Sequence, residues 1–526
     1  GRLAALSANA GGTVAPGHSL GVLHVSGDVT FLPGSVYEVE VAGQESDQIK
    51  VDGEAYLLGG VVSIRPEAGA KPLTPSELVA LRDRPYTILT AAGGVNGMFD
   101  AVEPGYVFIG ASLAYDATSV KATLARNGVA FESAGSTYNE RALLGGIDSA
   151  GFGNPLHDMI VVADNREMPA GIAAGISGSL VSATLAGVLA RDASVIGNAA
   201  QNRLRAAFDG VTVKEQAVIA SPLAYAPAAK PGPAFDAHPE LAEAHPELVE
   251  GAPATTALWG EAYGAFAHAD GDGNAAGYSR NTGGFVTGLD GVVAETWRMG
   301  VLAAYGNTSL DSGASNASAD SYSVGLYGGT AWDNLRLSLG AALTQNEIDT
   351  DRTAAFGNLL NRHSASWAAK TVQVFGELGY SLKTAYADFE PFAAASYVHL
   401  KSGGFQESGE ISNLTGLADT TDLTTTTLGL RASRSFAISQ TVALEAHGML
   451  GWSHAFGDVT PEQRLAFAGG QPFDVKGLPV ARDTGLVEAG FDVGIGKATT
   501  LGLTYSGQFS DSASDNAVKA DLTVRF

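Results

Sequence analysis

AVKADLTVRF, residues 517–526, ends the chain with side chains that alternate between apolar and polar. Successive side chains of a β-strand point to opposite faces, so Leu522, Val524 and Phe526 share one apolar face. Arg525 belongs to the opposite, charged face. The stretch therefore predicts a strand with one face against an apolar environment and the other against water.

The same alternation recurs through the second half of the chain, from residue 257 to residue 526. Its segments run to ten or more residues, whereas strands of soluble proteins commonly have ~5 to 6. An even number of such strands can close into a barrel with both chain ends on one side. The twelve segments begin near Trp259, Gly283, Thr296, Asp320, Asn334, Thr371, Tyr386, Asp422, Gln440, Thr484, Ala498 and Asp515.

Three features favour a transmembrane barrel over a soluble sandwich, whose strands would alternate as well. The segments match the ~9 to 11 residues that cross a bilayer obliquely. Aromatic residues such as Trp452 fall near segment ends, where an interfacial girdle is expected. Short turns alternate with long polar connections, which predict loops at 349–369, 403–421 and 454–483. We therefore expect a 12-stranded antiparallel transmembrane barrel over residues 257–526.

The polar strand faces would line the interior of such a barrel. Opposite charges on these faces would narrow and stiffen a water-filled lumen. The pattern assigns none of these side chains a catalytic role, so we interpret them as lining. The candidate lumen-lining residues are Arg298, Glu377, Arg431, Glu445, Glu488, Asp492 and Arg525.

The first half of this mainly β chain has a different pattern. Short apolar runs are cut by Gly and Pro every several residues, which favours the stacked rungs of a solenoid. We expect a stem that resembles a parallel β-helix over residues 1–115, with a small sandwich as the alternative. A helical connector is expected over 116–221, including a candidate pore helix at 192–208.

The run from Met168 to Ala190 has no charged residue and is long enough to be considered as a membrane helix. Its glycines, its serines and Pro169 dilute the apolar character that such a helix needs. A soluble helix is therefore favoured for this run.

A proline-rich stretch separates the two halves of the chain and predicts a semi-rigid or disordered linker over residues 222–256. The chain has no cysteine, which excludes disulfides and thiolate chemistry. Its net charge of -24, without a cluster of Lys and Arg, disfavours nucleic acid as a partner.

One motif points toward an enzyme: residues 17–21, GHSLG, match the G-x-S-x-G nucleophile elbow. That elbow needs a buried strand before the serine and a helix after it, whereas Pro16 precedes this motif and a strand-like run follows it. We interpret the motif as a turn.

Two other features suggest metal binding only weakly. Asp270, Asp272 and Asn274 resemble part of a calcium loop, but the distant Glu of an EF-hand is missing. The histidines are scattered, without the spacing of a metal site. We expect no catalytic residue, no cofactor and no metal site in this chain.

The chain resembles the C-terminal region of autotransporters, the type V secretion proteins of Gram-negative bacteria. The resemblance covers nearly the whole chain, and the order of its pieces is more specific than any single piece. It is carried by GGTVAPGHSLGVLHVSGDVTFLPGSVYEVEV (11–41), YTILTAAGGVNGMFDAV (86–102), STYNERALLGGIDSAGFGNPLHDMIV (136–161), SGSLVSATLAGVLARDASVIGNAAQNRLR (177–205), ALWGEAYGAFAHADGDGNAAGYSRNTGGFVTGLDG (257–291) and the closing LTVRF.

The resemblance implies a translocator that exports its own N-terminal passenger and anchors it at the cell surface, with the barrel in the cell outer membrane. It also implies that Leu522, Val524 and Phe526 form an assembly signal for the outer-membrane protein insertion machinery. The other implied partners are periplasmic chaperones, outer-membrane lipid and the passenger, and the barrel is expected to be monomeric.

In this family a helix threads the lumen, which implies that role for 192–208, or for 239–250 in the linker. Members that release their passenger often cut beside an asparagine pair in this helix. Here Asn198 and Asn202 stand alone, so they are a candidate cleavage region only, and an attached passenger is favoured. Two alternatives stay open: a passive porin, and an enzyme (protease or esterase) or adhesin whose active passenger lies upstream of Gly1.

Overall fold

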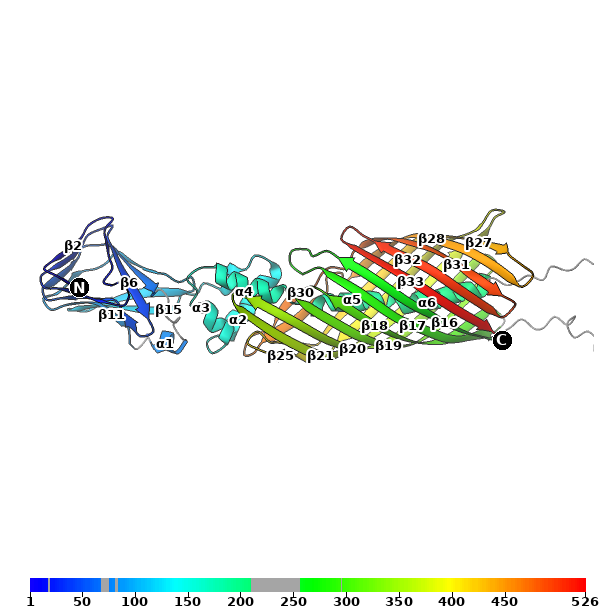
Figure 1. The fold of residues 1–526 in the computed structure, drawn as a ribbon, viewed down its shortest axis with the longest axis horizontal. Coiled ribbons are helices and arrows are strands. Elements are labelled where there is room, and N and C mark those ends of the chain that lie inside the picture. The colour runs from blue at the N-terminus through cyan, green and yellow to red at the C-terminus, as the bar shows by residue number, and fades with distance from the viewer. Residues whose placement is uncertain (18, 68–74, 81–83, 210–255, 295) are drawn as a thin grey trace, which may run out of the picture.

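The computed structural model describes residues 1–17, 19–67, 75–80, 84–209, 256–294 and 296–526. Three parts follow one another along the long axis: a stem of short strands, a group of helices and a barrel (Figure 1). Except for Thr256, the expected linker 222–256 lies outside the described residues, and so does the alternative pore plug at 239–250.

The strands of the stem fall in turn on three sheets, and strands from successive turns of the chain pair in parallel. Tyr37, for example, lies between Val14 and Val62. Inward side chains such as Phe31 and Ile49 are fully buried, because alternate residues of each strand point into the stem. The first sheet contains β1 (Arg2–Leu3), β4 (Val22–Val25), β8 (Gln48–Val51) and β11 (Tyr86–Ala91); the second contains β2 (Leu6–Ala8), β5 (Val29–Phe31), β9 (Glu54–Leu57) and β12 (Gly94–Gly97); the third contains β3 (Thr13–Val14), β6 (Val36–Ala42), β10 (Val61–Pro66) and β13 (Ala101–Pro104).

An antiparallel hairpin, β14 (Ile109–Tyr115) and β15 (Ser119–Arg126), ends the stem beside β11. The boundary expected at residue 115 falls in the turn of this hairpin, so the sheet continues into the region expected to be a helical connector. The continuation has a physical reason: Val120 and Ala122 are fully buried in the core of the stem. Two smaller elements, β7 (Glu45–Ser46) and α1 (Pro75–Ala80), complete this part.

The helical part starts with a short 3-10 helix, η1 (Phe131–Ala134). Five α-helices follow η1 and complete this part. A capping box formed by Thr137 and Glu140 begins the first of them, and Asn154 caps the second. The helices are α2 (Tyr138–Ala150), α3 (Pro155–Val161), α4 (Glu167–Ser177), α5 (Ser182–Asp192) and α6 (Ser194–Asp209).

The apolar run Met168 to Ala190 is divided between α4 and α5. By length and composition the helical stretch Glu167–Phe208 could cross a membrane, yet most of its most apolar window is buried inside the protein. Core helices of soluble proteins pass the same test, so this stretch is weak evidence for a membrane helix.

The C-terminal half is a closed antiparallel barrel of twelve long strands, which confirms the expected number. The last strand pairs with the first, with Arg525 opposite Ala257, and this seam closes the ring. The strands are β16 (Thr256–Ala269), β17 (Tyr278–Val293), β18 (Trp297–Asp311), β19 (Ser315–Trp332), β20 (Leu335–Phe356), β21 (Leu359–Tyr380), β23 (Asp388–Ser402), β27 (Asp419–Ala437), β28 (Val442–Gly457), β31 (Asp483–Ile495), β32 (Thr499–Phe509) and β33 (Ala513–Arg525).

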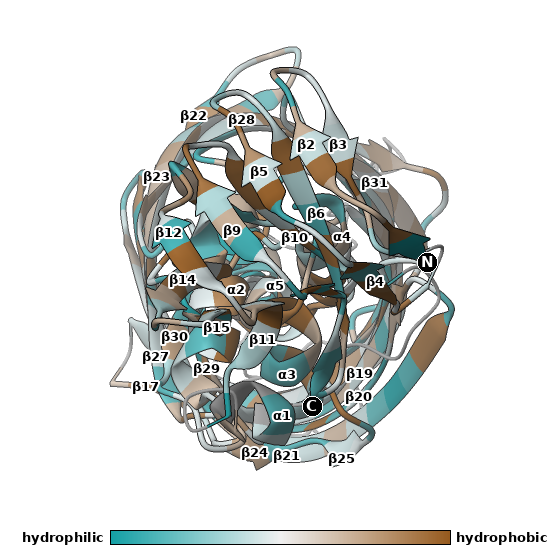
Figure 2. Ribbon diagram, turned by 90° about the vertical axis from the view of Figure 1, so that its left-hand side faces the viewer, coloured by the Kyte–Doolittle hydropathy of each residue, from teal (hydrophilic) through white to brown (hydrophobic). Residues whose placement is uncertain are grey.

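The outer face of the barrel is apolar. Large side chains such as Leu326, Val374 and Leu450 are exposed there, as expected for a surface that contacts lipid. The C-terminus lies at the end of the barrel remote from the stem, where Phe526 is exposed (Figure 1). Trp332, the last residue of β19, is exposed as well. Seen along the long axis from the stem side, the stem and the helices lie in front of the ring of strands (Figure 2).

The structure corrects the three expected long loops. Residues 349–369 are strand, because β20 and β21 each continue for 22 residues and meet at a tight turn. Gly357 has φ +57° in this turn, a conformation that suits glycine. Side chains such as Ala354 and Ala365 are buried, so this extension is covered by protein although its sequence is polar.

The loops expected at 403–421 and 454–483 contain a small four-stranded sheet of their own. Its strands pair in the order β24, β26, β29 and β30. They come from two different connections, so neither connection could form this sheet alone. The bounds are β24 (Phe405–Gln406), β26 (Leu414–Gly416), β29 (Glu462–Phe467) and β30 (Phe473–Lys476); the two-residue strands β22 (Leu382–Lys383) and β25 (Ser408–Gly409) pair with neighbouring barrel strands.

Candidate functional site

The lumen of the barrel is occupied by two consecutive helices, α5 and α6. Helix α5 is buried from Ser182 to Ala190 and packs against barrel residues such as Leu310, Ile348 and Leu400. The two helices have 11 and 16 residues, so together they rise about 40 Å at ~1.5 Å per residue. This exceeds the ~30 Å thickness of a bilayer core, so the two helices are long enough to span the membrane inside the barrel.

A narrow face of α6 packs on one wall of the barrel. Ile196, Ala200 and Leu204 contact a cluster of barrel side chains. A Cβ atom at Gly197 would lie 3.2 Å from the ring of Phe375, so a small residue is needed where the helix meets the wall. Small side chains explain why this face looks weakly apolar in the sequence although it is buried. The barrel side chains of the cluster are Trp259, Val286, Leu302, Ala304, Tyr327, Ala342 and Phe375.

A buried ion-pair network fixes α6 to this wall. Arg203 donates from Nε and Nη2 to the two oxygens of Asp290, at 2.6 and 2.9 Å. Arg298 binds the same carboxylate from the barrel side. Tyr327 donates to Asp290 at 2.8 Å and accepts from Trp259 Nε1 at 2.6 Å. Such fork-shaped pairs fix both direction and distance, so the network sets the position of α6 along the pore.

A second charged contact lies between α5 and α6. The carboxylate of Asp192 pairs with Arg280, and Thr308 donates to it at 2.9 Å. Arg280 also donates to Asp515 at 2.7 Å. The lumen helices are thus tied to the barrel by ion pairs at two levels.

A cavity of about 1510 Å³ remains beside α6. Of the candidate lumen-lining residues, Arg431, Glu445, Glu488, Asp492 and Arg525 line it. The other charged side chains that line the cavity include both acidic and basic residues, as expected for a water-filled space. These other charged residues are Arg203, Arg205, Glu261, Arg336, Lys383, Asp388, Glu390, Lys497, Lys519 and Asp521.

The other two candidate lining residues are engaged in ion pairs. Glu377 binds Arg431 at 2.6 Å, and Arg431 also donates to Glu390 at 2.9 Å. The guanidinium of Arg431 lies 3.6 Å from the centre of the Phe392 ring. Arg298 is buried beside Asp290 and does not line the large cavity.

The two asparagines of the candidate cleavage region lie on α6. Asn198 is exposed, whereas Asn202 lines the cavity and accepts a hydrogen bond from Arg205. The three candidate assembly residues lie at the closing seam: Leu522 and Phe526 have 45% and 66% of their surface exposed on the outer face, and Val524 is half-buried.

The sequence analysis missed the residues that hold α6, above all Arg203 and Asp290. In the sequence, each is a single charged residue, and its neighbours do not show whether its side chain faces water or a buried partner. Arg203 and Asp290 lie 87 residues apart in the chain, so no local pattern could have paired them. The available signal was the set of charges in a helix expected to enter a lumen, namely Asp192, Arg203 and Arg205.

The described residues of the enzyme-like motif, Gly17 and 19–21, lie between β3 and β4 of the stem. Ser19 donates its hydroxyl hydrogen to Glu67, and Gly21 N–H donates to Asp47 at 2.7 Å. In the loop at Asp272, its carboxylate accepts from two backbone N–H groups, those of Asn274 and Ala275. No group of three or more His, Asp or Glu side chains in the described ranges could hold a metal ion.

Known proteins resemble this chain in sequence. Residues 258–506 match the family model of the autotransporter beta-domain. Two proteins of Serratia marcescens called extracellular serine protease are 33% and 31% identical to it, over 540 and 524 residues. These alignments cover 100% and 97% of this chain but 51% and 49% of the relatives. The chain therefore spans about half the length of the curated relatives it matches.

Two solved structures show a similar barrel. The translocator domain of the autotransporter NalP from Neisseria meningitidis is 16% identical, with 56% of this chain and 96% of that chain covered and a TM-score of 0.44. The β domain of the Bordetella autotransporter BrkA is 17% identical, with 52% of this chain and 100% of that chain covered and a TM-score of 0.40.

The family match runs from the first strand of the barrel into β32 and coincides with the part that closes around α5 and α6. Residues 258–506 thus belong to the autotransporter β-domain family, and the barrel of this chain is an autotransporter translocator domain of the outer membrane.

Proposed function

We propose that the chain exports its own N-terminal region through the barrel and holds it at the cell surface. One observation carries this proposal: α5 and α6 cross the lumen, while the stem lies at one end and the first strand begins at the other. A covalent chain that occupies the pore in this way is the arrangement left when a passenger has passed through it.

The N-terminal region would be a β-helical stem of the passenger. Its support is the order of strands β1 to β13, which apart from β7 fall on three sheets in turn and pair in parallel between successive turns of the chain. Each further rung that folds outside the cell buries apolar surface and opposes backward movement of the chain. The antiparallel hairpin of β14 and β15 would close the end of the stem nearest the membrane.

The lumen charges would serve as a polar path for the extended chain during export. Leu522, Val524 and Phe526 would be recognised by the outer-membrane insertion machinery after passage with periplasmic chaperones. The exposure of Leu522 and Phe526 at the seam supports such recognition. The passenger would remain attached at Asn198 and Asn202. Denaturing gels of outer membranes should show the uncut chain, and a break within α6 would contradict the attachment.

A second function, secreted proteolysis, is favoured by the relatives called extracellular serine protease. We assign this activity to a passenger upstream of Gly1. Purified chain 1–526 should then leave a protein substrate such as casein intact, while a longer product of the same gene hydrolyses it. Hydrolysis by residues 1–526 alone would contradict this assignment.

The absence of cysteine allows a clean test of export. Asn9 is exposed on the stem, and Ser439 lies in the turn between β27 and β28 at the opposite end. A membrane-impermeant maleimide should label the Asn9→Cys variant on intact cells and the matched Ser439→Cys variant only after the outer membrane is opened. Labelling of Asn9→Cys only after opening would refute surface export.

A further inference from the structure

One hydrophobic core runs without a break from the stem, through the helices, into the outer parts of the barrel. It includes Phe31 of the stem, Leu144 of α2 and Ile176 of α4. It also includes Phe405 and Phe467 of the small sheet. We call η1 and α2–α4 the helical base. The stem, the helical base and the outer ends of the barrel are therefore one folded unit.

We call two outer parts of the barrel the docking platform: the outer ends of β20 and β21, and the small sheet of β24, β26, β29 and β30. Helices α2 and α4 approach it closely through glycines. A Cβ atom at Gly146 would overlap the ring of Phe473, and one at Gly175 would overlap the carbonyl of Ala355. The platform and the helices thus fit at a spacing that larger residues would prevent.

Buried polar contacts add specificity to this fit. Asn139 of α2 is 2% exposed. Its side-chain amide donates to the carbonyl of Lys476 at 2.9 Å and accepts from the N–H of Lys476 at 2.8 Å. The backbone N–H of Asn139 donates to the side chain of Asn274 at 2.8 Å. An Asn buried in this way costs free energy unless its partners are in place, so the contact selects one alignment.

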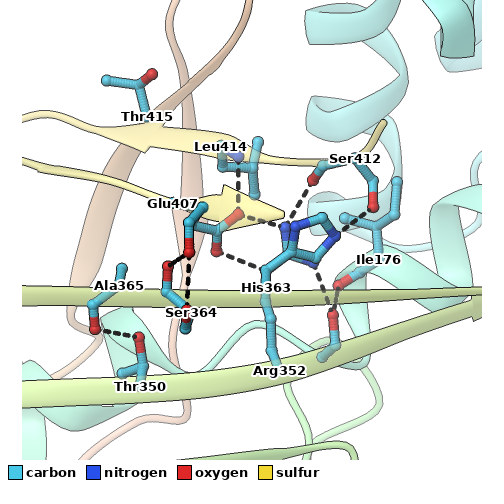
Figure 3. A network of polar contacts seen from close by, with 12 residues as sticks. Ile176, Thr350, Arg352, His363, Ser364, Ala365, Glu407, Ser412, Leu414 and Thr415 are labelled. Carbon is cyan, nitrogen blue, oxygen red and sulfur yellow. Dashed lines mark hydrogen bonds and ion pairs between the residues drawn. The ribbon is translucent and has the colours of Figure 1, made fainter. Parts of the chain in front are cut away.

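An ion pair at the edge of the platform holds the turn between α4 and α5 (Figure 3). Arg352 donates from Nε and Nη2 to the two oxygens of Glu407, each at 2.6 Å. Its Nη1 donates to Ser179 Oγ at 3.2 Å, and Nη2 also donates to the Ser412 carbonyl at 2.7 Å. Arg352 and Glu407 are 5% and 8% exposed.

We propose that the docking platform receives α2–α4 as the last exported residues and that this docking ends export in one fixed register. The inference rests on the proposed export of the N-terminal region. Before docking, apolar side chains of the platform such as Phe405 and Phe467 have no cover, and the helices expose Leu144 and Ile176. Their joint burial outside the membrane favours the exported state and holds the stem in one orientation on the barrel.

An engineered disulfide tests the docked state in cells. An ideal Cβ atom at Gly470 would lie 3.4 Å from the Cβ of Ala150, close to the ~3.5–4.5 Å of natural disulfides, and 2.9 Å from the carbonyl oxygen of Gly146, so the backbone at this contact must shift slightly to admit it. The double variant Ala150→Cys/Gly470→Cys should cross-link on intact cells under a mild oxidant, seen as faster migration without reductant. Neither single variant should shift. Absence of the cross-link in fully exported chains, when the single variant Gly470→Cys keeps its protease resistance, would overturn the proposal.

Two glycines of α4 provide a disrupting substitution and its control. In the cross-linking background, Gly175→Val should abolish the disulfide and make the helical base sensitive to protease added to cells. Gly171→Val, on the same helix with no atom within 4 Å of its Cβ position, should keep both properties. Equal behaviour of the two variants would overturn the proposal.

Labelling of the Asn9→Cys variant, without the other two cysteines and in cells grown in parallel, separates the two hypotheses. If Asn9→Cys is labelled on intact cells but the disulfide does not form, docking is refuted and export stands. If Asn9→Cys is protected, the proposed export itself has failed. Heat-dependent gel migration of the barrel confirms that each variant contains a folded β-domain, so loss of the disulfide reports on docking.

Discussion

Asp290 is the residue on which the position of α6 depends. It accepts from Arg203 of the helix and from Arg298 and Tyr327 of the barrel, and it is 2% exposed. Removing one member of a buried ion-pair network leaves the remaining charges without compensation. This cost exceeds what the intact pair contributes relative to apolar side chains.

Asp290→Asn should therefore lower the free energy of unfolding of the chain by about 3–5 kcal/mol, since Arg203 and Arg298 lose their counter-charge. Urea unfolding in lipid vesicles measures this change. Glu488→Gln is the control, because Glu488 lines the open cavity, and it should change stability by less than about 0.5 kcal/mol. A loss of equal size in both variants would show that Asp290 has no special role.

His157 of α3 gives the helical base a pH dependence. It is 3% exposed and packs against Phe131 and Phe152. Burial lowers the pKa of His157 from its ordinary value of 6.5, although Asp158 Oδ1, 3.4 Å from Nδ1, acts in the opposite direction. Between the lowered pKa and 6.5 the unfolded chain binds the proton more readily, so stability falls as the pH drops below 6.5.

The protease resistance of the helical base should accordingly decrease between about pH 7 and about pH 5. His157→Gln should reduce this pH dependence, because the titrating group is gone, even if it lowers resistance at every pH. Limited proteolysis of purified chain across this range provides the measurement. A pH profile that His157→Gln leaves unchanged would assign the effect to other groups.

At the scale of elements, α5 and α6 act as a plug with two modes of attachment. Helix α5 is buried from Ser182 to Ala190, α6 is packed on one side, and the ion pairs of Asp192 and Arg203 fix the helices along the pore. The cavity of about 1510 Å³ on the free side of α6 shows that the helices fill only part of the cross-section.

Removal of the plug should open the pore. A chain of residues 210–526 should conduct ions severalfold better in planar bilayers than a chain of residues 182–526, which keeps both lumen helices. The reason is the volume that α5 and α6 occupy beside the cavity. Equal conductance of the two chains would mean that α5 and α6 do not obstruct the path of ions.

The barrel strands were predicted from alternation where one face contacts lipid, and missed where protein covers them. Alternation predicted the twelve barrel strands, because one face contacts lipid and the other water. It placed the start of β21 near Thr371, whereas that strand begins at Leu359. The missed residues alternate too, but with small and polar side chains, and only contact with the helical base shows which face is buried.

At the scale of the whole molecule, closure of the barrel depends on the first and last residues of the β-domain. The backbone N–H of Phe526 donates to Thr256 O at 3.0 Å, and Thr256 N–H donates back to Phe526 O at 3.3 Å. The ring of Phe526 contributes little to this pairing and is 66% exposed. Backbone pairing and side-chain recognition can thus be separated.

Phe526→Ala, which keeps the backbone pair, should reduce the amount of assembled barrel in the outer membrane nearly as much as deletion of Phe526, if the ring is the assembly signal. Phe526→Tyr should restore assembly. Outer-membrane fractionation with heat-dependent gel migration measures the folded barrel. Normal assembly of the Phe526→Ala variant would show that the ring is no assembly signal and that Phe526 acts only through its backbone pairing at the seam.

The sequence by itself determined the strand type, the number of strands and the barrel, because a period of two is a local property that each segment displays independently. It also placed a helix in the lumen through a family resemblance, within two residues of the observed start of α6. Only the tertiary structure decided which charges hold that helix and that the polar extension of β20 and β21 is covered by protein. Arg203 and Asp290, like Arg352 and Glu407, come from distant parts of the chain, and a charge has the same local pattern whether it faces water or a buried partner.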